Sequence, residues 1–461
     1  MNAADVAGKS ISIIGAERSG VAVALLLKHK GAKVFVSDFG NSDRTKQHIA
    51  ELQQQNIECE FGGHSERVYN CSLMVISPGV PSNAPVVLEA KRRGINVVAE
   101  IEAASWFCKG PIIAITGSNG KTTTTTLLGR MFSDAKKKHI VAGNIGTAFS
   151  SLVMDVDEET VVVLEVSSFQ LDFIDSFRPK IAVILNITQN HMDRYEHSME
   201  KYALSKCRIF KNQQHDDLLI MNAEDAWTKK TATQYQSKAY NFSLKHAVEN
   251  GSFLERNSVK LKINGTEETV ISTDEIFIKG EHNVQNAMAA SLAARLSGIS
   301  LPSIQATLKS FTGVEHRQEF VREVNGIIYI NNSKATTVEA VEMALKSYKK
   351  PIVLIMGGKD KGNDYSTIYD LVKQKVKALI ATGYSADTIV KNFSDKVKTV
   401  KVETMGTAIP NIESMKKTID IATQSAQRGD IVLLAPACTS YDWFTDYEER
   451  GNIFKQLVGQ L

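Results

Sequence analysis

Cysteine is scarce in this chain of 461 residues, and its five cysteines stand far apart: Cys59, Cys71, Cys108, Cys207 and Cys438. No two of them have the close spacing of a zinc site or of a redox pair, which excludes both classes of site. Scattered single cysteines are typical of proteins whose thiols stay reduced. We therefore expect a cytoplasmic protein without a disulfide framework.

An excess of charge of one sign is also lacking. The chain has 54 Lys and Arg against 51 Asp and Glu, a formal net charge of +3, which gives no reason to expect nucleic-acid or membrane partners. No apolar run approaches the ~20 residues that a membrane-spanning helix needs. Residues 1–5 lack a basic segment followed by an apolar one, so we expect no signal peptide.

Short apolar runs recur along the chain, each followed by Gly, Ser, Asn, Asp or Glu, with helical patterns between them. They are Ile11–Ile14, Val34–Val36, Leu73–Ile76, Ile112–Ile115, Val161–Leu164, Ile181–Leu185, Leu218–Met221, Ile352–Met356, Ala378–Ala381 and Ile431–Leu434. This alternation predicts an α/β protein with parallel sheets that are covered by helices on both faces. Ligands of such sheets bind at the carboxyl ends of the strands, where these polar residues stand.

The length of the chain predicts about three domains, because one core seldom extends over so many residues. We expect a Rossmann-like domain over residues 1–109, a central P-loop ATPase-like domain over 110–313 and a second Rossmann-like domain over 314–461. Two hairpins are expected at the Asn-Gly pairs 264–265 and 325–326, since both residues tolerate positive φ. An Ala-rich helix is expected over 284–296.

The strongest functional motif follows the apolar run Ile112–Ile115 and reads Thr116-Gly117-Ser118-Asn119-Gly120-Lys121-Thr122. A buried strand that ends in a glycine turn before a helix directs backbone N–H groups and a helix N-terminus at one point, which suits a polyphosphate. The motif departs from the usual eight-residue phosphate loop because Ile115 stands where the first glycine belongs. We interpret it as an ATP site in which Lys121 reaches the outer phosphates and Thr122 holds magnesium.

A second glycine turn opens the chain, where Gly15-Ala16-Glu17-Arg18-Ser19-Gly20 precedes a helix and Val34–Val36 leads to Asp38. The pattern resembles a dinucleotide-binding βαβ unit, but its glycines lack the G-x-G-x-x-G spacing. A nicotinamide cofactor, a uridine nucleotide and a simple structural turn all remain open from these residues.

Two further residues follow buried runs. Glu165 ends Val161–Leu164 and is interpreted, together with Lys121 and Thr122, as a magnesium ligand. His191 follows the run ending at Leu185, and the residues alone leave open a metal ligand, a phosphate contact and an ordinary loop residue.

These segments and others, in order along almost the whole chain, resemble the Mur ligases, which use ATP to add amino acids to a peptidoglycan precursor. The matching motifs are Thr116–Thr122, Gly143-Asn144-Ile145-Gly146, Glu165–Leu171, His191–Tyr195, Lys206–Phe210, Gly280–Asn283 with Asn286, His316-Arg317, Ser333-Lys334-Ala335-Thr336, Gly357–Gly362 and Pro436–Ser440. The Ser-Ser-Phe-Gln-Leu, Ser-Lys-Ala-Thr and Pro-Ala-Cys elements resemble the branch of the family that adds D-glutamate.

The resemblance implies a role for each motif. The UDP-sugar, UDP-N-acetylmuramoyl-L-alanine, would lie against Asp38, Ser77, Pro78, Gly79 and Asn144. ATP would be bound by Gly117–Thr123 (Ser118, Asn119, Gly120, Lys121, Thr122 and Thr123 among them), Asn286, Arg317 and Asn332. Two Mg²⁺ ions would be held by Thr122, Glu165, His191 and a carbamylated Lys206, with Lys121, His191 and Lys206 serving catalysis. D-Glutamate would be bound by Lys334, Thr336, Lys361, Ser440 and Tyr447. A monomer is expected.

Some residues depart from the family pattern, and others have a second interpretation. Asn190 and Asn332 stand where the family has aspartates, so each site keeps an acceptor oxygen but loses a charge, and Tyr447 stands at a phenylalanine position. Without the resemblance, Lys206 reads as a solvated helical lysine beside Arg208.

The alternatives to a D-glutamate ligase are a folylpolyglutamate synthase-like ligase and a catalytically weakened nucleotide-binding homologue. A dehydrogenase leaves the phosphate loop unexplained.

Overall fold

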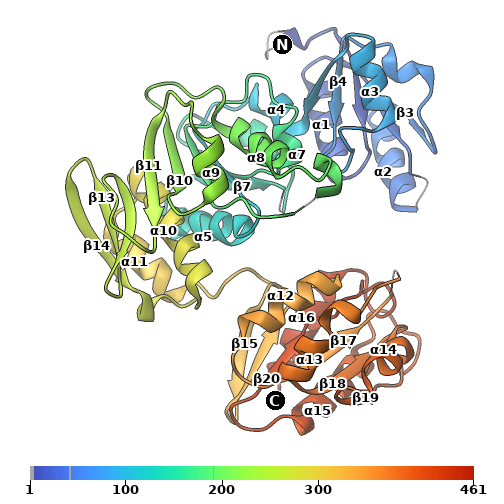
Figure 1. The fold of residues 1–461 in the computed structure, drawn as a ribbon. Coiled ribbons are helices and arrows are strands. Elements are labelled where there is room, and N and C mark those ends of the chain that lie inside the picture. The colour runs from blue at the N-terminus through green and yellow to red at the C-terminus, as the bar shows by residue number, and fades with distance from the viewer. Residues whose placement is uncertain (1–4, 41–42, 145, 191, 361) are drawn as a thin grey trace. The chain divides into compact units, whose positions relative to one another are not determined.

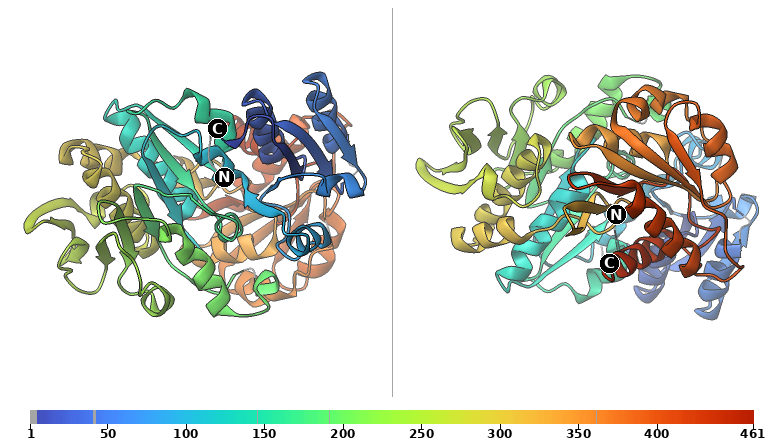
Figure 2. Two further views of the ribbon diagram at one scale, coloured as in Figure 1. Left: turned by 90° about the horizontal axis from the view of Figure 1, so that it is seen from above. Right: turned by 90° about the horizontal axis from the view of Figure 1, so that it is seen from below.

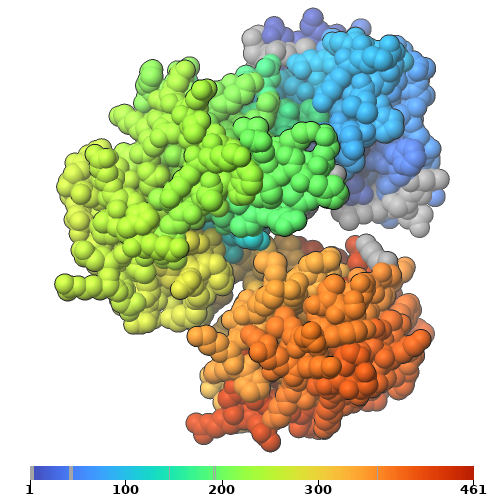
Figure 3. Space-filling view, in the orientation of Figure 1, coloured from blue at the N-terminus to red at the C-terminus, as the bar shows by residue number. Residues whose placement is uncertain are grey.

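The computed structural model describes residues 5–40, 43–144, 146–190, 192–360 and 362–461, so that His191 and Lys361 lie outside the described residues. Its contacts divide the chain into two compact units, Met1–Phe311 and Thr312–Leu461. Figure 1 and the all-atom view of Figure 3 colour the first unit blue to yellow and the second orange to red. No helix in the described ranges is long and apolar enough to cross a membrane.

Three sheets, one in each predicted domain, organise the chain. The first is fully parallel in the order β3-β2-β1-β4-β5, with strands β1 (Ser10–Ile14), β2 (Lys33–Asp38), β3 (Glu58–Phe61), β4 (Leu73–Ile76) and β5 (Asn96–Ala99). The predicted α/β class with parallel sheets is confirmed. The predicted domain boundaries stay predictions.

The central sheet has the order β14-β13-β12-β11-β10-β9-β6-β8-β7 and is parallel from β7 to β12. Its strands are β6 (Ile112–Thr116), β7 (His139–Gly143), β8 (Val161–Glu165), β9 (Ile181–Ile184), β10 (Leu218–Asn222), β11 (Lys238–Ser243), β12 (Gly251–Glu255), β13 (Ser258–Ile263) and β14 (Thr266–Ser272). Strands β13 and β14 form the first predicted hairpin, with Ile263 opposite Thr266.

The second unit is built on a sheet in the order β15-β16-β20-β17-β18-β19, parallel except for β15. Its strands are β15 (Glu319–Val324), β16 (Ile327–Asn331), β17 (Ile352–Gly357), β18 (Val376–Thr382), β19 (Lys398–Lys401) and β20 (Ile431–Leu434). Strands β15 and β16 form the second predicted hairpin, so both hairpin predictions are confirmed.

Helices follow most strands. Those of the first unit are α1 (Arg18–His29), α2 (Asp43–Gln54), α3 (Pro85–Arg92), α4 (Glu100–Ser105), α5 (Lys121–Asp134), α6 (Phe149–Leu152), α7 (Ser168–Leu171), α8 (Met199–Cys207), α9 (Ala226–Thr231), α10 (Glu281–Leu296) and α11 (Leu301–Ser310). Those of the second are α12 (Val338–Ser347), α13 (Tyr369–Lys375), α14 (Ala386–Phe393), α15 (Ile412–Ser425) and α16 (Tyr447–Val458). The predicted helix over 284–296 is confirmed within α10.

Alternate residues of the central strands pack on opposite faces, because successive side chains of a strand point to opposite sides of the sheet. Ile113 and Ile115 of β6 pack with α5, α10 and α11, whereas Ile112 and Ala114 belong to the core on the other face. In the second unit the residues of β17 divide in the same way between α12–α14 and α15–α16. Figure 2 shows helices on both faces of these sheets.

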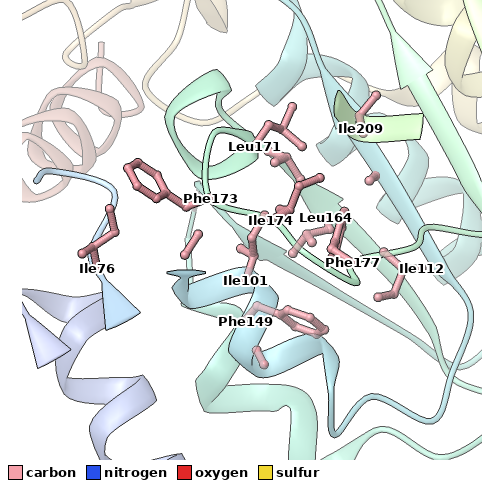
Figure 4. Packing of buried hydrophobic residues seen from close by; sticks show 14 of the residues in the cluster. Ile76, Ile101, Ile112, Phe149, Leu164, Leu171, Phe173, Ile174, Phe177 and Ile209 are labelled. Atoms are coloured by element: carbon pink, nitrogen blue, oxygen red, sulfur yellow. The ribbon is translucent and has the colours of Figure 1, made fainter. Parts of the chain in front are cut away.

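The first and central sheets share one continuous core. Met74 and Ile76 of β4 lie in the same hydrophobic cluster as Ile112 and Leu164 of the central sheet. In Figure 4, Ile101 of α4 lies near Phe149 of α6, and Phe173 faces Ile76. This shared core explains why residues 1–311 form a single compact unit.

A buried carboxylate reinforces this junction. Glu102 of α4 accepts hydrogen bonds from Trp106 Nε1 (2.8 Å), from the backbone N–H groups of Asp175, Ser176 and Phe177 (2.8–3.0 Å) and from Ser176 Oγ (2.6 Å). Burial alone would raise the pKa of Glu102, but these bonds outweigh it and lower the pKa. The charged Glu102 therefore joins the first domain to the central one.

Candidate nucleotide and amino-acid sites

The phosphate loop connects β6 to α5, as the motif predicted. Gly120 caps the helix in the left-handed region (φ 83°), and a Cβ there would lie 2.3 Å from Asn286 Oδ1. Only glycine meets both conditions, since it has no Cβ and adopts positive φ without strain. The buried Asn286 of α10 also accepts a hydrogen bond from Thr124 Oγ1 (3.2 Å). Asn286, predicted to contact ATP, thus lies directly against the loop.

The segment after β9 braces the same loop. Ser118 N donates to Asn186 O (2.9 Å), and Ser118 Oγ donates to Thr188 O (2.9 Å). The backbone N–H of Asn119 donates to Asn186 Oδ1 (2.9 Å), and Asn186 Nδ2 donates back to Asn119 O (3.1 Å). These hydrogen bonds hold the loop in shape.

Two lysines meet at the carbonyl oxygen of Gly117. Lys121 Nζ donates to it at 2.7 Å and Lys206 Nζ at 2.8 Å. Lys206 lies on α8, is 1% exposed and is placed 4.7 Å from the centre of the Tyr202 ring. Burial, and then the charge of Lys121, lower the pKa of Lys206 well below its ordinary value. The interpretation of Lys206 as a solvated lysine is wrong, because α8 packs this face against the phosphate loop.

Glu165 is the last residue of β8, which pairs with β6, the strand that precedes the phosphate loop. Ile115 of β6 lies opposite Glu165. Glu165 is 1% exposed, and its Oε1 accepts a hydrogen bond from Asn144 Nδ2 at 2.8 Å. Its Oε2 is buried and has no hydrogen-bond partner among the described residues. Because an unpaired buried carboxylate oxygen is costly, this atom is suited to a cation.

The donor set fits Mg²⁺, which prefers oxygen ligands and keeps water and substrate phosphates in its shell. Besides Glu165, the hydroxyl-bearing Thr122 is buried in the first turn of α5, and Thr123 beside it is half-buried. The described part of the chain holds no cluster of three His, Cys, Asp or Glu that would chelate a metal by itself. His191, predicted as a further ligand, lies outside the described residues.

Four of the five predicted UDP-sugar residues lie at the carboxyl ends of β2 and β4, whereas the fifth, Asn144, follows β7 of the central sheet. Asp38 accepts hydrogen bonds from the backbone N–H groups of Ala16 and Gly40, so its carboxylate already shapes the loop after β1. Ser77 is buried, and its hydroxyl donates a hydrogen bond to Gly15 O (3.0 Å). The next two residues are more accessible: Pro78 is half-buried and Gly79 is exposed. Asp38 and Ser77 therefore fix two neighbouring loops.

Among the predicted D-glutamate residues of the second unit, Lys334 and Thr336 follow β16, Ser440 follows β20 and Tyr447 begins α16. Lys334 is exposed, Thr336 and Tyr447 are half-buried and Ser440 is buried. The ammonium of Lys334 lies 5.6 Å from the centre of the Tyr447 ring. Lys361 lies outside the described residues. Three of the four described residues thus retain access to solvent.

Arg450 of α16 holds these loops together, and the sequence analysis missed it. It is 3% exposed and donates to Ser333 Oγ (2.9 Å), Ser333 O (2.8 Å) and Cys438 O (3.2 Å). Ser333 Oγ in turn donates to Tyr447 O (2.8 Å). Burial lowers the pKa of Arg450 to about 10, and Asp442 opposes this effect. The sequence does contain a signal for this residue, because Arg450 is an arginine within the apolar pattern of the last helix.

The two remaining predicted ATP residues also lie in the second unit. Arg317 is exposed, in a turn before β15. Asn332 is buried, and its Oδ1 accepts a hydrogen bond from the backbone N–H of Gln318 (3.1 Å). Their roles toward ATP stay predictions.

Comparisons with known proteins agree with this geometry. Three family models match consecutive parts of the chain: the MurD N-terminal domain over residues 10–86, the Mur ligase middle domain over 115–294 and the Mur ligase glutamate ligase domain over 316–438.

Full-length relatives extend the match. The chain is 42% identical to the UDP-N-acetylmuramoylalanine–D-glutamate ligase of Chloroherpeton thalassium, with 99% of each chain covered. It is 40% identical to the ligase of the same name from Salinibacter ruber, covering 98% of this chain and 97% of that one. The structure of the UDP-N-acetylmuramate-alanine ligase MurC from Thermotoga maritima has the same fold, with a TM-score of 0.56 at 20% identity over 98% of this chain and 99% of that one. This chain belongs to the Mur ligase family.

Proposed function

We propose that this enzyme joins D-glutamate to UDP-N-acetylmuramoyl-L-alanine in an ATP-dependent reaction of peptidoglycan precursor synthesis. One observation carries the chemistry: a rigid phosphate loop on which Lys121 and Lys206 meet at one carbonyl, beside the buried Glu165. The substrate pair is that of the relatives which match the chain over its full length.

The reaction requires the L-alanyl carboxylate to be activated, because a carboxylate is a poor acylating group. A carboxylate oxygen attacks the γ-phosphorus of ATP, and ADP leaves with the bridging oxygen. The amine of D-glutamate then attacks the carbonyl carbon of this acyl phosphate. Phosphate departs with the former carboxylate oxygen, and the amine proton passes to solvent or a base. The contribution of the protein is positioning and charge stabilisation.

In this scheme Lys121 stabilises negative charge on the outer phosphates, and the backbone N–H groups of residues 117–123 hold the phosphate chain at the start of α5. Thr122 and Glu165, with His191, would hold Mg²⁺. When bound, Mg²⁺ neutralises charge on the β- and γ-phosphate oxygens. Asn144, which is already bonded to Glu165, would orient the muramoyl substrate.

The burial of Lys206 supports the proposal that it is carbamylated. Because its pKa is lowered, Lys206 is the uncharged amine more often than an exposed lysine is, and the nitrogen lone pair of that amine can attack CO₂. The N–C bond that forms leaves a carbamate anion after loss of one proton. The product would give the site a second anionic ligand beside Glu165, and with it a place for a second Mg²⁺.

The exposed Lys334, with Thr336, Lys361, Ser440 and Tyr447, would bind D-glutamate, since ammonium and hydroxyl groups pair with its two carboxylates. Because every residue that we propose for these subsites belongs to one chain, we propose a monomer without nucleic-acid or membrane partners. Because ATP and UDP-sugars are cytoplasmic metabolites, we place the reaction in the cytoplasm.

The test is phosphate release from ATP and Mg²⁺ with UDP-N-acetylmuramoyl-L-alanine, in the presence of D-glutamate, L-glutamate, L-lysine or no amino acid. We expect release that depends on both the UDP-sugar and D-glutamate. Release that depends on a folate substrate instead would indicate a folylpolyglutamate synthase-like ligase. ATP binding without any release would indicate a homologue with lost catalysis.

A further inference from the structure

The loop that follows β10 lies beside the segment that braces the phosphate loop. It comprises residues 222–225, Asn-Ala-Glu-Asp, which belong to none of the predicted sites. Strands β10, β9 and β6 are neighbours in the central sheet and run parallel, so the loops at their carboxyl ends lie in a row. The middle loop of this row is the segment 186–188, which contacts Ser118 and Asn119. The row therefore leads from the loop 222–225 to the phosphate loop.

Two hydrogen bonds from the loop 222–225 flank Asn186. The buried Asn222 donates from Nδ2 to Leu185 O (3.1 Å), and the backbone N–H of Ile187 donates to Asp225 Oδ2 (2.9 Å). One bond precedes Asn186 and the other follows it. The loop thus fixes the backbone on both sides of Asn186, and with it the direction of the side chain that bonds the phosphate loop.

The other carboxylate oxygen of Asp225 begins helix α9. Asp225 Oδ1 accepts hydrogen bonds from the backbone N–H of Thr228 (2.7 Å) and from Thr228 Oγ1 (2.8 Å), which is the usual arrangement of a helix N-cap. A cap needs this oxygen alone. The bond from Oδ2 to Ile187, 38 residues earlier in the chain, is a second task that the cap does not explain.

We infer that Asp225 is a positioning residue that holds the phosphate loop in the shape that binds ATP. Its action passes from Oδ2 through the segment 186–188 to Ser118 and Asn119. The position needs two acceptor oxygens, because α9 engages one of them and Ile187 the other. This inference rests on the proposed role of the loop toward the phosphates of ATP, and it adds a residue that supports the loop from a neighbouring strand.

The experiment separates the two oxygens with Asp225→Ser. Serine caps a helix about as well as aspartate, but it has one side-chain oxygen, which the cap engages. Loss of the Ile187 bond should raise the KM for ATP about fivefold and leave the KM values for UDP-N-acetylmuramoyl-L-alanine and D-glutamate within about twofold. In the ligand-free protein, the amides of Ser118 and Asn119 should exchange hydrogen about fivefold faster, with unchanged exchange in β1.

The matched control is Thr228→Val, which changes the cap side of the same carboxylate. It removes the hydroxyl that bonds Asp225 Oδ1 and keeps the bond from Ile187 to Oδ2. The KM for ATP and the exchange rates of Ser118 and Asn119 should therefore stay within about twofold of the wild type. Asp225→Thr, which also keeps a capping hydroxyl, provides the same test if the serine variant unfolds.

Wild-type KM values and exchange rates in Asp225→Ser would overturn the inference. Equal effects in Asp225→Ser and Thr228→Val would overturn it as well, because they would show that Asp225 acts only as a helix cap. A common rise of all three KM values would contradict it, since it would indicate general destabilisation. The exchange measurement uses no substrate, so it decides the inference even if phosphate release shows that the proposed ligase function is wrong.

Discussion

The phosphate loop of the first unit and the loops of the second unit that we propose to bind D-glutamate both have lysines beside them, but these lysines lie in different surroundings. Lys206 is buried at a backbone carbonyl, and its pKa is well lowered. Lys334 is exposed, and the buried Arg450 supports its loop by donating a hydrogen bond to the carbonyl of the preceding residue, Ser333. The comparison teaches that burial lowers the pKa of a lysine, whereas a lysine on a braced surface loop stays accessible to the carboxylates of a ligand.

The largest expected effect comes from the buried lysine. Lys206→Met should lower kcat about 10²–10³-fold, the range for loss of one charge-stabilising group. It should also stabilise the first unit by about 1–3 kcal/mol, because a buried amine is replaced by an apolar chain while Lys121 still bonds Gly117 O. Phosphate-release kinetics and urea unfolding measure the two effects. The exposed Lys211→Met is the control, and a wild-type kcat in Lys206→Met would contradict the account.

The same lysine should make stability depend on pH. Because the pKa of Lys206 is lowered in the folded state, the unfolded chain binds more protons between that pKa and the ordinary value of 10.5. The free energy of unfolding should therefore rise with pH through this range. Unfolding curves from pH 6 to pH 9 should show a smaller rise for Lys206→Met than for the wild type. Equal slopes would mean that Lys206 keeps its ordinary pKa.

The next effect concerns the support beneath the exposed lysine. Arg450→Met should destabilise the second unit by about 3 kcal/mol, because it leaves Asp442 and the carbonyls of Ser333 and Cys438 without their buried partner. The KM for D-glutamate should rise more than that for ATP. Calorimetry should show a lower unfolding temperature for one transition only. The exposed Arg428→Met serves as control, and equal shifts of both transitions would argue against a local role.

The smallest expected effect lies at the junction within the first unit. Glu102→Gln replaces one of the two acceptor oxygens with an NH₂ group, which would face the donors that now bond to that oxygen. The substitution should lower the free energy of unfolding by about 2 kcal/mol. Since the folded-state pKa of Glu102 is lowered, its stabilisation is present above its ordinary pKa of 4.5 and is lost as pH falls through the lowered value. Unfolding at pH 3 and pH 7 should differ less in Glu102→Gln than in the wild type. The exposed Glu158→Gln is the matched control.

The apolar runs of the sequence predicted the strands at the centre of each parallel sheet. Leu73–Ile76 and Ile431–Leu434 have the same bounds as β4 and β20, because central strands of parallel sheets are continuous apolar runs. The sequence did not predict the strands β3 (Glu58–Phe61) and β19 (Lys398–Lys401). They lie at sheet edges and carry polar residues, so no apolar run marks them.

The candidate site was predictable in its local motif and less so in its long-range contacts. The phosphate loop from Thr116 to Thr122 is contiguous, and its strand, glycine turn and helix appear as predicted. The burial of Lys206 depends on how α8 packs against a loop 89 residues earlier in the chain, which no local pattern encodes. Arg450 was missed for the same reason, because its partners lie in separate loops.

The most direct test of the account is the fate of the carboxylate oxygen. UDP-N-acetylmuramoyl-L-alanine labelled with ¹⁸O in its alanyl carboxylate is turned over with ATP, Mg²⁺ and D-glutamate, and the released phosphate is examined by mass spectrometry. The account predicts one ¹⁸O atom in each phosphate, transferred when the acyl phosphate breaks down. Phosphate without the label, alongside formation of the D-glutamyl product, would contradict activation of the carboxylate by phosphoryl transfer.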